Sequence, residues 1–263
     1  MNSNTLTFVV LGLIAVGFIV WKVLPFFKKA AHLSKSLFSK IYLNKNSALT
    51  ADQYKKIALG AIYSEQQTAF INSLTTGSTN FSDILGKWWG IQNKEDALSK
   101  LDYLKDKGFR FYFPVVYKAF LSPEADQEEL IIAAFVDDED QEKAETQLMY
   151  LKETIGELKD EKIINQESDL LKYGNDGWDF GRLVFLTRLC YDAGYITEDE
   201  AWAYINAANE LARSKFDSWE SYSKSYIIGR GMWGGIDSAN TGIMSIASYL
   251  LKLPESPWVQ MPW

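Results

Sequence analysis

The 263-residue sequence contains one cysteine and one histidine, and each scarcity excludes a class of chemistry. A single cysteine cannot form an internal disulfide, and Cys190 lies inside an apolar run where we expect it to pack in the core. Because His32 is the only imidazole, a histidine-based catalytic triad and a His/Cys zinc site are excluded. The sequence therefore predicts no metal and no cofactor, and any acid–base chemistry would use carboxylates, tyrosines or lysines.

Acidic residues are absent from the first 51 positions, where six lysines give a charge of +6. The whole chain carries a net charge of −7, so residues 52–263 carry −13. Neutralising nucleic-acid phosphates needs a basic surface, so this acidic body argues against a nucleic-acid partner. The basic residues gather instead in one N-terminal segment that follows a long apolar run.

Residues 6–27 form that apolar run, and no charged side chain interrupts it between Thr5 and Trp21. About 20 apolar residues are enough to span a bilayer as a helix. A buried soluble helix would rarely lack a polar face, and a cleaved signal peptide would carry Lys or Arg before the run, where residues 1–4 carry none. We therefore expect residues 1–25 to be a retained, single-pass transmembrane anchor.

The lysines that follow the run set the expected orientation. By the positive-inside rule, the N-terminus faces outward across the cytoplasmic (inner) membrane and the remaining chain faces the cytoplasm. Residues 26–49 also form a basic amphipathic segment with apolar positions along one helical side. We expect Lys28, Lys29, Lys35 and Lys40 to contact membrane lipids at about 1 kcal/mol each near an anionic leaflet, with a solvated tether as the alternative.

Residues 50–263 are predicted to form one helical globular domain. Thr50 with Gln53 and Thr197 with Glu200 are capping boxes, in which each side chain bonds the other residue's backbone N–H at a helix start. The expected helices cover residues 51–74, 81–89, 94–107, 138–159, 178–193, 218–228 and 238–252, with others beginning at Ser122-Pro123 and at Thr197. The fold class is therefore all-α.

Two segments are expected to depart from the helical pattern. Residues 110–113 are at most a minor strand, because Pro114 interrupts them and no partner strand follows. The proline-rich tail at residues 254–263 is expected to be non-helical, with Trp258 and Trp263 docked on the body.

The central stretch, residues 177–235, contains the polar side chain that fits least well on a solvated surface. Arg182 lies among apolar neighbours, and a buried, unpaired guanidinium is costly. We therefore expect a carboxylate from Asp179, Glu200 or Glu220 to meet it. A buried ion pair that sets helix register is favoured over an anion-binding or catalytic arginine.

Other charged residues in and near this stretch have simpler interpretations. Arg188 and Asp192 are four residues apart and are expected to pair on one helix. Arg230 lies among glycines that follow a helix without phosphate-loop spacing, so we expect a helix end and close backbone packing. The third helix of the stretch is expected to start at Asp217 or Ser218, and Asp217 with Glu220 would form a capping box there. The acidic run at residues 137–140 lacks the alternating ligands of a calcium loop, so a solvated turn is favoured.

Widely spaced tryptophan, glycine and arginine positions from about residue 55 to the C-terminus resemble the bacterial domain-of-unknown-function family 1266. The positions that carry the resemblance are Trp89-Gly90-Ile91, Ala97-Leu98, Leu101, Gly108, Arg110, Asp179, Arg182-Leu183, Gly194-Tyr195-Ile196, Glu200-Ala201-Trp202, Ser218-Trp219-Glu220, Gly229-Arg230, Trp233, Ser256-Pro257-Trp258 and Pro262-Trp263. Phe109 departs from the histidine expected in a Gly-His-Arg motif, so no imidazole acts there. The resemblance implies the extent of the domain and no chemistry.

Three functions are compatible with these observations. The first is a membrane-anchored, cytoplasm-facing protein-interaction module without enzymatic activity. The second is an enzyme or effector domain acting on an anionic substrate through Arg182, Glu200, Glu220, Arg230 and Asp179, with Tyr222 or Tyr226. The third is a lipid-headgroup or envelope role carried by the basic segment. We expect Trp178, Trp202, Trp219 and Trp233 to be structural aromatics.

Overall fold

The computed structural model describes residues 41–78 and 81–263, and every regular element in those ranges is helical. The α-helices are α2 (Ala51–Ile57), α3 (Ala61–Gln66), α4 (Phe81–Asp83), α5 (Lys94–Asp106), α6 (Phe113–Phe120), α7 (Glu124–Ala134), α8 (Asp138–Asp160), α9 (Asp169–Tyr173), α10 (Asp176–Asp192), α11 (Glu198–Lys215), α12 (Trp219–Gly234), α13 (Ser238–Leu250) and α14 (Pro257–Gln260). The predicted all-α class is confirmed for these residues.

The expected anchor and residues 26–40 of the basic segment lie outside the described residues. Within residues 41–78 and 81–263, no helix combines the length and the apolar character needed to cross a bilayer.

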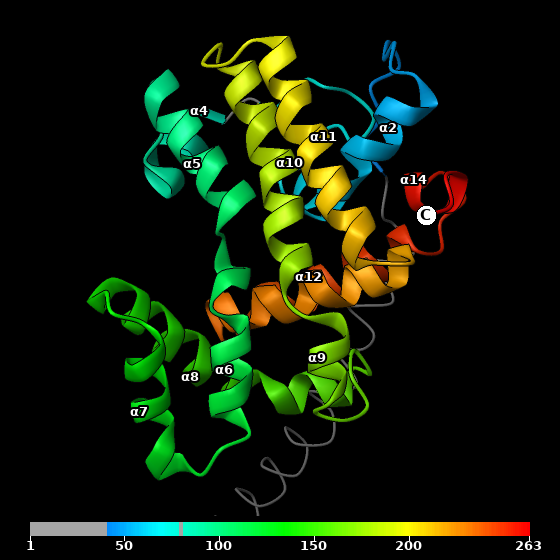
Figure 1. Cartoon of the computed structure of the whole chain (residues 1–263). Coiled ribbons are helices and arrows are strands. Elements are labelled where there is room, and N and C mark those ends of the chain that lie inside the picture. The colour runs from blue at the N-terminus through cyan, green and yellow to red at the C-terminus, as the bar shows by residue number, and fades with distance from the viewer. Residues whose placement is uncertain (1–40, 79–80) are drawn as a thin grey trace, which may run out of the picture. The chain divides into compact units, whose positions relative to one another are not determined.

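Helix α10 is the central element of the domain. It packs against α5, α11, α12 and the short segment formed by the 3₁₀ turn η1 (Ala58–Gly60) and α3 (Figure 1). Every residue from Gly177 to Cys190 is buried, so the helix has no polar face. This explains the apolar run that predicted it, and it confirms that Cys190 is a core residue. Burial raises the pKa of the Cys190 thiol to about 12.

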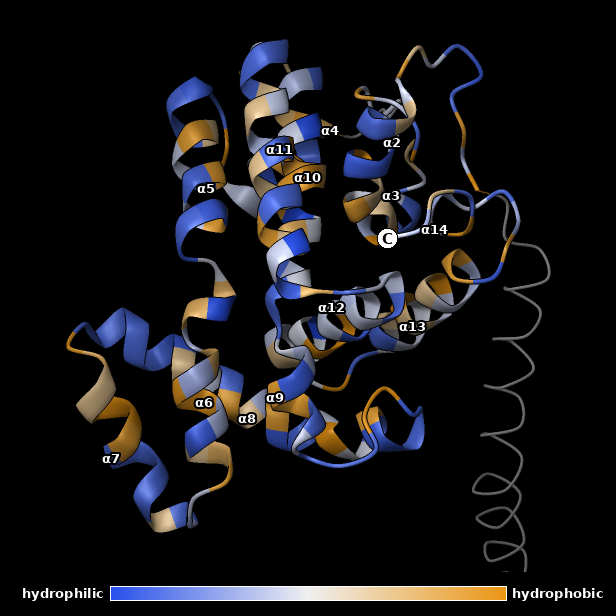
Figure 2. Cartoon of the chain, turned by 45° about the vertical axis from the view of Figure 1, so that its right-hand side comes forward, coloured by the Kyte–Doolittle hydropathy of each residue, from blue (hydrophilic) through white to orange (hydrophobic). Residues whose placement is uncertain are grey.

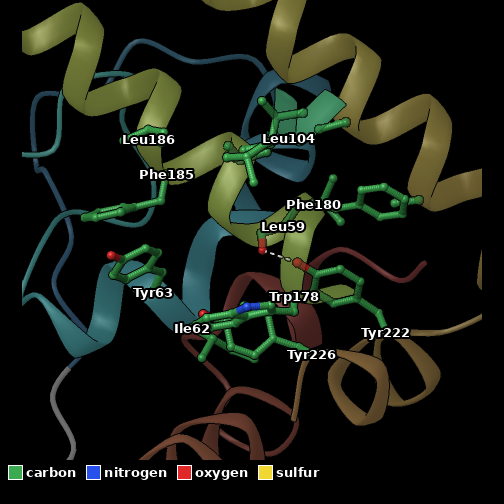
Figure 3. Close-up of a cluster of buried hydrophobic side chains, with 14 of the residues drawn as sticks. Leu59, Ile62, Tyr63, Leu104, Trp178, Phe180, Phe185, Leu186, Tyr222 and Tyr226 are labelled. Atoms are coloured by element: carbon green, nitrogen blue, oxygen red, sulfur yellow. Dashed lines mark hydrogen bonds between the residues drawn. The ribbon is translucent and has the colours of Figure 1, made fainter. Parts of the chain in front are cut away.

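Glycines permit α10 and α12 to cross closely. A Cβ at Gly177 would lie 2.8 Å from both the Tyr222 carbonyl oxygen and the Tyr226 amide nitrogen of α12. On the other helix, a Cβ at Gly229 would collide with Trp178. Because the two helices are close, the rings of Trp178 and Tyr226 pack against each other in the core (Figure 3). Their centroids are 5.0 Å apart.

The loop after α3 is held by a buried guanidinium. Arg188 is fully buried and donates to the Ser64 hydroxyl (2.8 Å) and to three backbone carbonyls of the loop, those of Phe70, Leu74 and Thr75. The expected Arg188–Asp192 pair is therefore wrong. The Asp192 carboxylate instead accepts from the amide and hydroxyl of Thr76 in the same loop.

Two helix ends differ from the expectation. The helix expected over residues 51–74 ends at Gln66, because Thr68 adopts a positive φ of 55° and the chain turns back toward Arg188. Helix α12 continues to Gly234, so Gly229 and Gly231 lie inside a helix and not at its end. It stops at Gly235, whose φ of 63° suits glycine.

Local structure also differs from the expectation in two short segments. The expected strand at residues 110–113 is wrong: a 3₁₀ turn, η3 (Phe109–Phe111), leads into α6, where Pro114 occupies the first turn and needs no N–H partner. The capping box of α12 joins Ser218 to Ser221, and not Asp217 to Glu220. The boxes at Thr50 and Thr197 are confirmed.

The C-terminal tail docks on the body as expected, although α14 makes four of its residues helical. Ser256 caps this short helix by accepting from the Trp258 amide. The Trp258 ring stacks on Trp219 at 5.1 Å, and its indole N–H donates to the Ala58 carbonyl (2.9 Å). Trp263 donates to the Phe216 carbonyl (2.8 Å).

The close packing at Gly177 predicts that a Gly→Ala substitution there and one at an exposed helical glycine change the stability of the domain in opposite directions. Gly177→Ala forces a methyl group against the α12 backbone and should lower the free energy of unfolding by about 1–3 kcal/mol. Gly156→Ala, on an exposed turn of α8 with no heavy atom within 4 Å, should raise it by roughly 0.5–1 kcal/mol. Urea unfolding of both variants checks the pair. A stabilising Gly177→Ala would show that the two helices do not approach this closely.

Glu65 should make stability depend on pH. Burial raises the pKa of this carboxyl above its usual 4.5, and Tyr249 of α13 donates to it (2.7 Å). The folded chain therefore keeps the proton over a window that starts near 4.5, where the unfolded chain has lost it, so stability falls as pH rises through that window. We expect Glu65→Gln to raise the melting temperature more at pH 8 than at pH 4.5. An equal change at both pH values would contradict this.

Candidate functional site

The site begins with one carboxylate between two guanidiniums. Asp179 is completely buried and bonds the Arg182 side chain, three residues along α10, at 2.5 Å. Its other oxygen accepts from the Arg110 amide (2.8 Å) and guanidinium (3.3 Å). Gly108 makes room for this oxygen, since a side chain there would collide with it and would have to adopt a φ of 62°. The prediction that Asp179 meets Arg182 is confirmed.

Aromatic rings surround the Arg182 guanidinium. Its central carbon lies 4.7 Å from the Trp178 ring centroid, 5.2 Å from that of Phe109 and 5.6 Å from that of Trp89. Cations over such faces are stabilised by the ring quadrupole. Phe109, where histidine was expected, thus contributes a cation–π contact to the site. Only 5% of Arg182 is exposed.

Arg230 reaches the same place from α12. It pairs with Asp237 (2.9 Å), which also accepts from the Ala239 amide, and these contacts lower the pKa of that carboxyl. The guanidinium lies over the Trp233 ring at 4.9 Å and against the backbone of Gly234. Its second terminal nitrogen, Nη1, is buried and has no hydrogen-bond partner.

The two guanidiniums meet at one pocket of about 340 Å³, which we call the Arg–Trp pocket. Its lining residues are Tyr63, Gln66, Gln67, Trp88, Trp89, Trp178, Arg182, Arg230 and Trp233. No carboxylate lines it, although residues 52–263 carry −13. The Trp178 indole nitrogen is a second buried donor without a partner. The pocket is therefore lined by two guanidinium side chains, two amides and flat aromatic rings.

The two glutamates predicted as site residues lie elsewhere. Glu200 closes the capping box of α11 and pairs with Lys94 (2.6 Å), and both contacts lower the pKa of its carboxyl. Glu220 is in the exposed first turn of α12 and pairs with Lys224 (2.9 Å). Neither glutamate lines the Arg–Trp pocket.

Of the four predicted structural tryptophans, two line the Arg–Trp pocket and two lie elsewhere. Trp178 and Trp233 line the pocket, whereas Trp219 holds the C-terminal tail through the Met261 carbonyl (2.8 Å). Trp202 bonds Glu198 in the first turn of α11.

Tyr222 and Tyr226 are fully buried, and burial raises the pKa of each phenol well above 10. Tyr222 donates to the Leu59 carbonyl (2.5 Å), as the dashed line in Figure 3 shows. Neither phenol is poised as a general base.

Sequence reasoning missed half of the site. Arg110 and Trp89 were noted only as family positions, and Gln66 and Gln67 were not noted at all. The sequence marks Arg110 only through its place after Gly108 in the family resemblance, and no local pattern pairs it with Asp179, which is 69 residues away. No local signal places α3 or Trp88 beside α10.

The acidic residues at 137–140 lie at the N-terminus of α8, where Asp137 caps the helix. Asp137 accepts from the amides of the first turn, and Asp140 pairs with Lys107 (2.6 Å) and accepts from the Tyr112 hydroxyl (2.6 Å). Among residues 41–78 and 81–263, no three His, Cys, Asp or Glu side chains are grouped as a metal site.

Residues 84–263 match the family model described as "Protein of unknown function (DUF1266)". A search of curated proteins and a search of solved structures each found no match. Arg110, Asp179, Arg182 and Arg230 all fall within the matched residues, whereas Tyr63, Gln66 and Gln67 precede them.

Removing the shared carboxylate should destabilise the domain strongly. Asp179→Ala leaves two guanidiniums without their buried partner, so the free energy of unfolding should fall by about 3–5 kcal/mol. The matched control is Glu167→Ala, which removes the partly exposed pair with Lys159 and should cost about 0–1 kcal/mol. Urea unfolding measures both. Equal losses in the two variants would show that Asp179 does not organise the site.

Proposed function

The chain belongs to the DUF1266 family of proteins of unknown function, and we propose that its Arg–Trp pocket binds a small anionic ligand with a planar body. The domain would then act as a recognition module and not as an enzyme. The observation that carries this proposal is the convergence of two buried guanidiniums on a pocket without a carboxylate.

The charge around the pocket favours an anion. Arg110 and Arg182 share the single negative charge of Asp179, so this group keeps one positive charge in excess. Arg230 is matched by Asp237, yet its Nη1 has no acceptor in the structure. Arg182 and Arg230 both line the pocket, and hydrogen bonds from such charged groups contribute about 1.5–3 kcal/mol each.

The rings of the pocket favour a planar ligand body. Trp88 and Trp233 are 63% and 46% exposed at the pocket, while Trp178 is buried between helices. Large exposed aromatic side chains around a concave site are typical of ligand pockets, which usually have volumes of about 300–1,000 Å³. At about 340 Å³ this pocket suits a ligand of metabolite size and not a folded partner.

The lining offers little for acid–base catalysis. Tyr63 is its only titratable side chain besides the two arginines, and burial raises the pKa of that phenol. A general base works best with a pKa near the operating pH. Binding is therefore the better supported function, and the alternative enzyme acting on an anionic substrate has no candidate base in the lining.

The location of the module follows from the sequence. We propose that residues 1–25 anchor it in the cytoplasmic membrane with the helical domain in the cytoplasm, and that lysines 28, 29, 35 and 40 contact anionic lipid. The domain would then bind its ligand at the inner face of the membrane. Ligand binding would in turn change the affinity of the domain for a partner protein.

Isothermal titration calorimetry of the full chain in detergent tests the pocket. The probes are indole-3-acetate and phenyl phosphate, each compared with a neutral counterpart, indole-3-acetamide and phenol. Because hydrogen bonds to charged groups contribute about 1.5–3 kcal/mol, each anion should bind at least about tenfold more tightly than its counterpart. Equal affinities, or no binding of either anion, would overturn the proposal.

A charge placed in the lining should weaken binding without removing a buried group. Gln67→Glu adds a carboxylate at the end of α3, and we expect it to weaken phenyl phosphate binding by about tenfold or more. Gln260→Glu makes the same change at an exposed position of α14 and should leave the affinity unchanged. An equal effect of the two variants would place the binding site elsewhere.

A further inference from the structure

A second hollow lies between α7 and α8, away from the Arg–Trp pocket. It has a volume of about 650 Å³, and we call it the acid-rimmed groove. Its lining residues are Glu124, Gln127, Glu128 and Ile131 of α7 and Glu145, Leu148, Met149, Lys152 and Glu153 of α8. Figures 1 and 2 place α7 at an edge of the described domain, with α6 and α8 as its neighbours.

The spacing of the lining residues is that of an open helix–helix seam. On α7 they recur at positions i, i+3, i+4 and i+7, and on α8 the same spacing starts at Glu145. Two neighbouring helices with such faces form a groove in which a third helix commonly packs. The floor is apolar, with Ile131 and Leu148 buried beneath an exposed Met149, which is 47% accessible.

Two further apolar side chains near the C-terminal end of α7 are exposed outside the groove lining. Ile132 is 50% exposed, and Val136 is fully exposed in the turn that follows.

The charged residues around the groove are mainly acidic. Four glutamates surround the floor, and Lys152 is the only basic residue of the lining. Its ammonium lies 3.9 Å from Glu124 and 40% of its side chain is exposed, so it offsets little of the negative charge. Glu128 and Glu145 are exposed, and their side chains form no ion pair or hydrogen bond with another residue in the described ranges 41–78 and 81–263. A ligand that is electrostatically complementary to this groove must therefore be positively charged.

We infer that the acid-rimmed groove binds a basic amphipathic helix of a partner protein. The apolar stripe of that helix would lie on Ile131, Leu148 and Met149, and its flanking lysines or arginines would meet the four glutamates. The 11 residues of α7 span about 16 Å, which accommodates roughly three turns of the partner helix. Methionine in the floor suits such a site because its flexible thioether adapts to different apolar side chains.

The probe is a fluorescein-labelled synthetic 14-residue peptide with leucine at i, i+3, i+4 and i+7 and lysine elsewhere. Its binding to the full chain in detergent is followed by fluorescence anisotropy. The test variant carries Glu128→Lys and Glu145→Lys together, and the matched control carries Glu210→Lys on the exposed face of α11. All proteins share one detergent, so peptide binding to micelles is common to them, and circular dichroism confirms that each variant is folded.

The peptide should bind the unaltered chain, bind the double variant at least tenfold more weakly, and bind the Glu210→Lys protein with unchanged affinity. A version of the peptide with glutamate in place of lysine should not bind. Equal binding to all three proteins, equal binding of the glutamate peptide, or no binding to the unaltered chain would each overturn the inference. Sedimentation that reveals a dimer lost only in the double variant would also overturn it, since the groove would then hold a second copy of this chain.

Discussion

The structure depends on the way Asp179 shares one buried negative charge between two guanidiniums. This carboxylate joins α10 to the turn that carries Arg110, which is 69 residues earlier in the chain. It also aligns Arg182 with the rings that surround it. A buried charge of either sign alone would be prohibitively costly, so each member of the group requires the others. Arg182, one of the two guanidiniums of this group, lines the Arg–Trp pocket, which is the physical basis of the proposed anion binding.

The second constraint is the close crossing of α10 and α12. Gly177 and Gly229 bring the two backbones together, and Arg182 and Arg230 then reach the same pocket from different helices. The glycines therefore determine the geometry of the pocket although they do not line it. Larger residues would separate the helices and move the guanidiniums apart, even though no side chain of the pocket itself would have changed.

The sequence predicted the features that arise from neighbouring residues. Thr50, Thr197 and Gly194 mark helix ends through local hydrogen bonds or a positive φ, and Asp179 lies one helical turn from Arg182. It did not predict features that need distant segments. Glycines inside α12 resemble a helix end until Trp178 is known to pack on Gly229, and nothing near Arg188 indicates that its acceptors are loop carbonyls.

The buried donors of the core also decide which part of the chain can fold as a unit. Arg188, Tyr222 and Trp258 find their acceptors in residues 58–75, all of which precede the matched family region that starts at residue 84. A chain shortened to that region would keep these donors and lose what they bind. The smallest autonomous folding unit is therefore larger than the family boundary implies, and residues 58–75 belong to it.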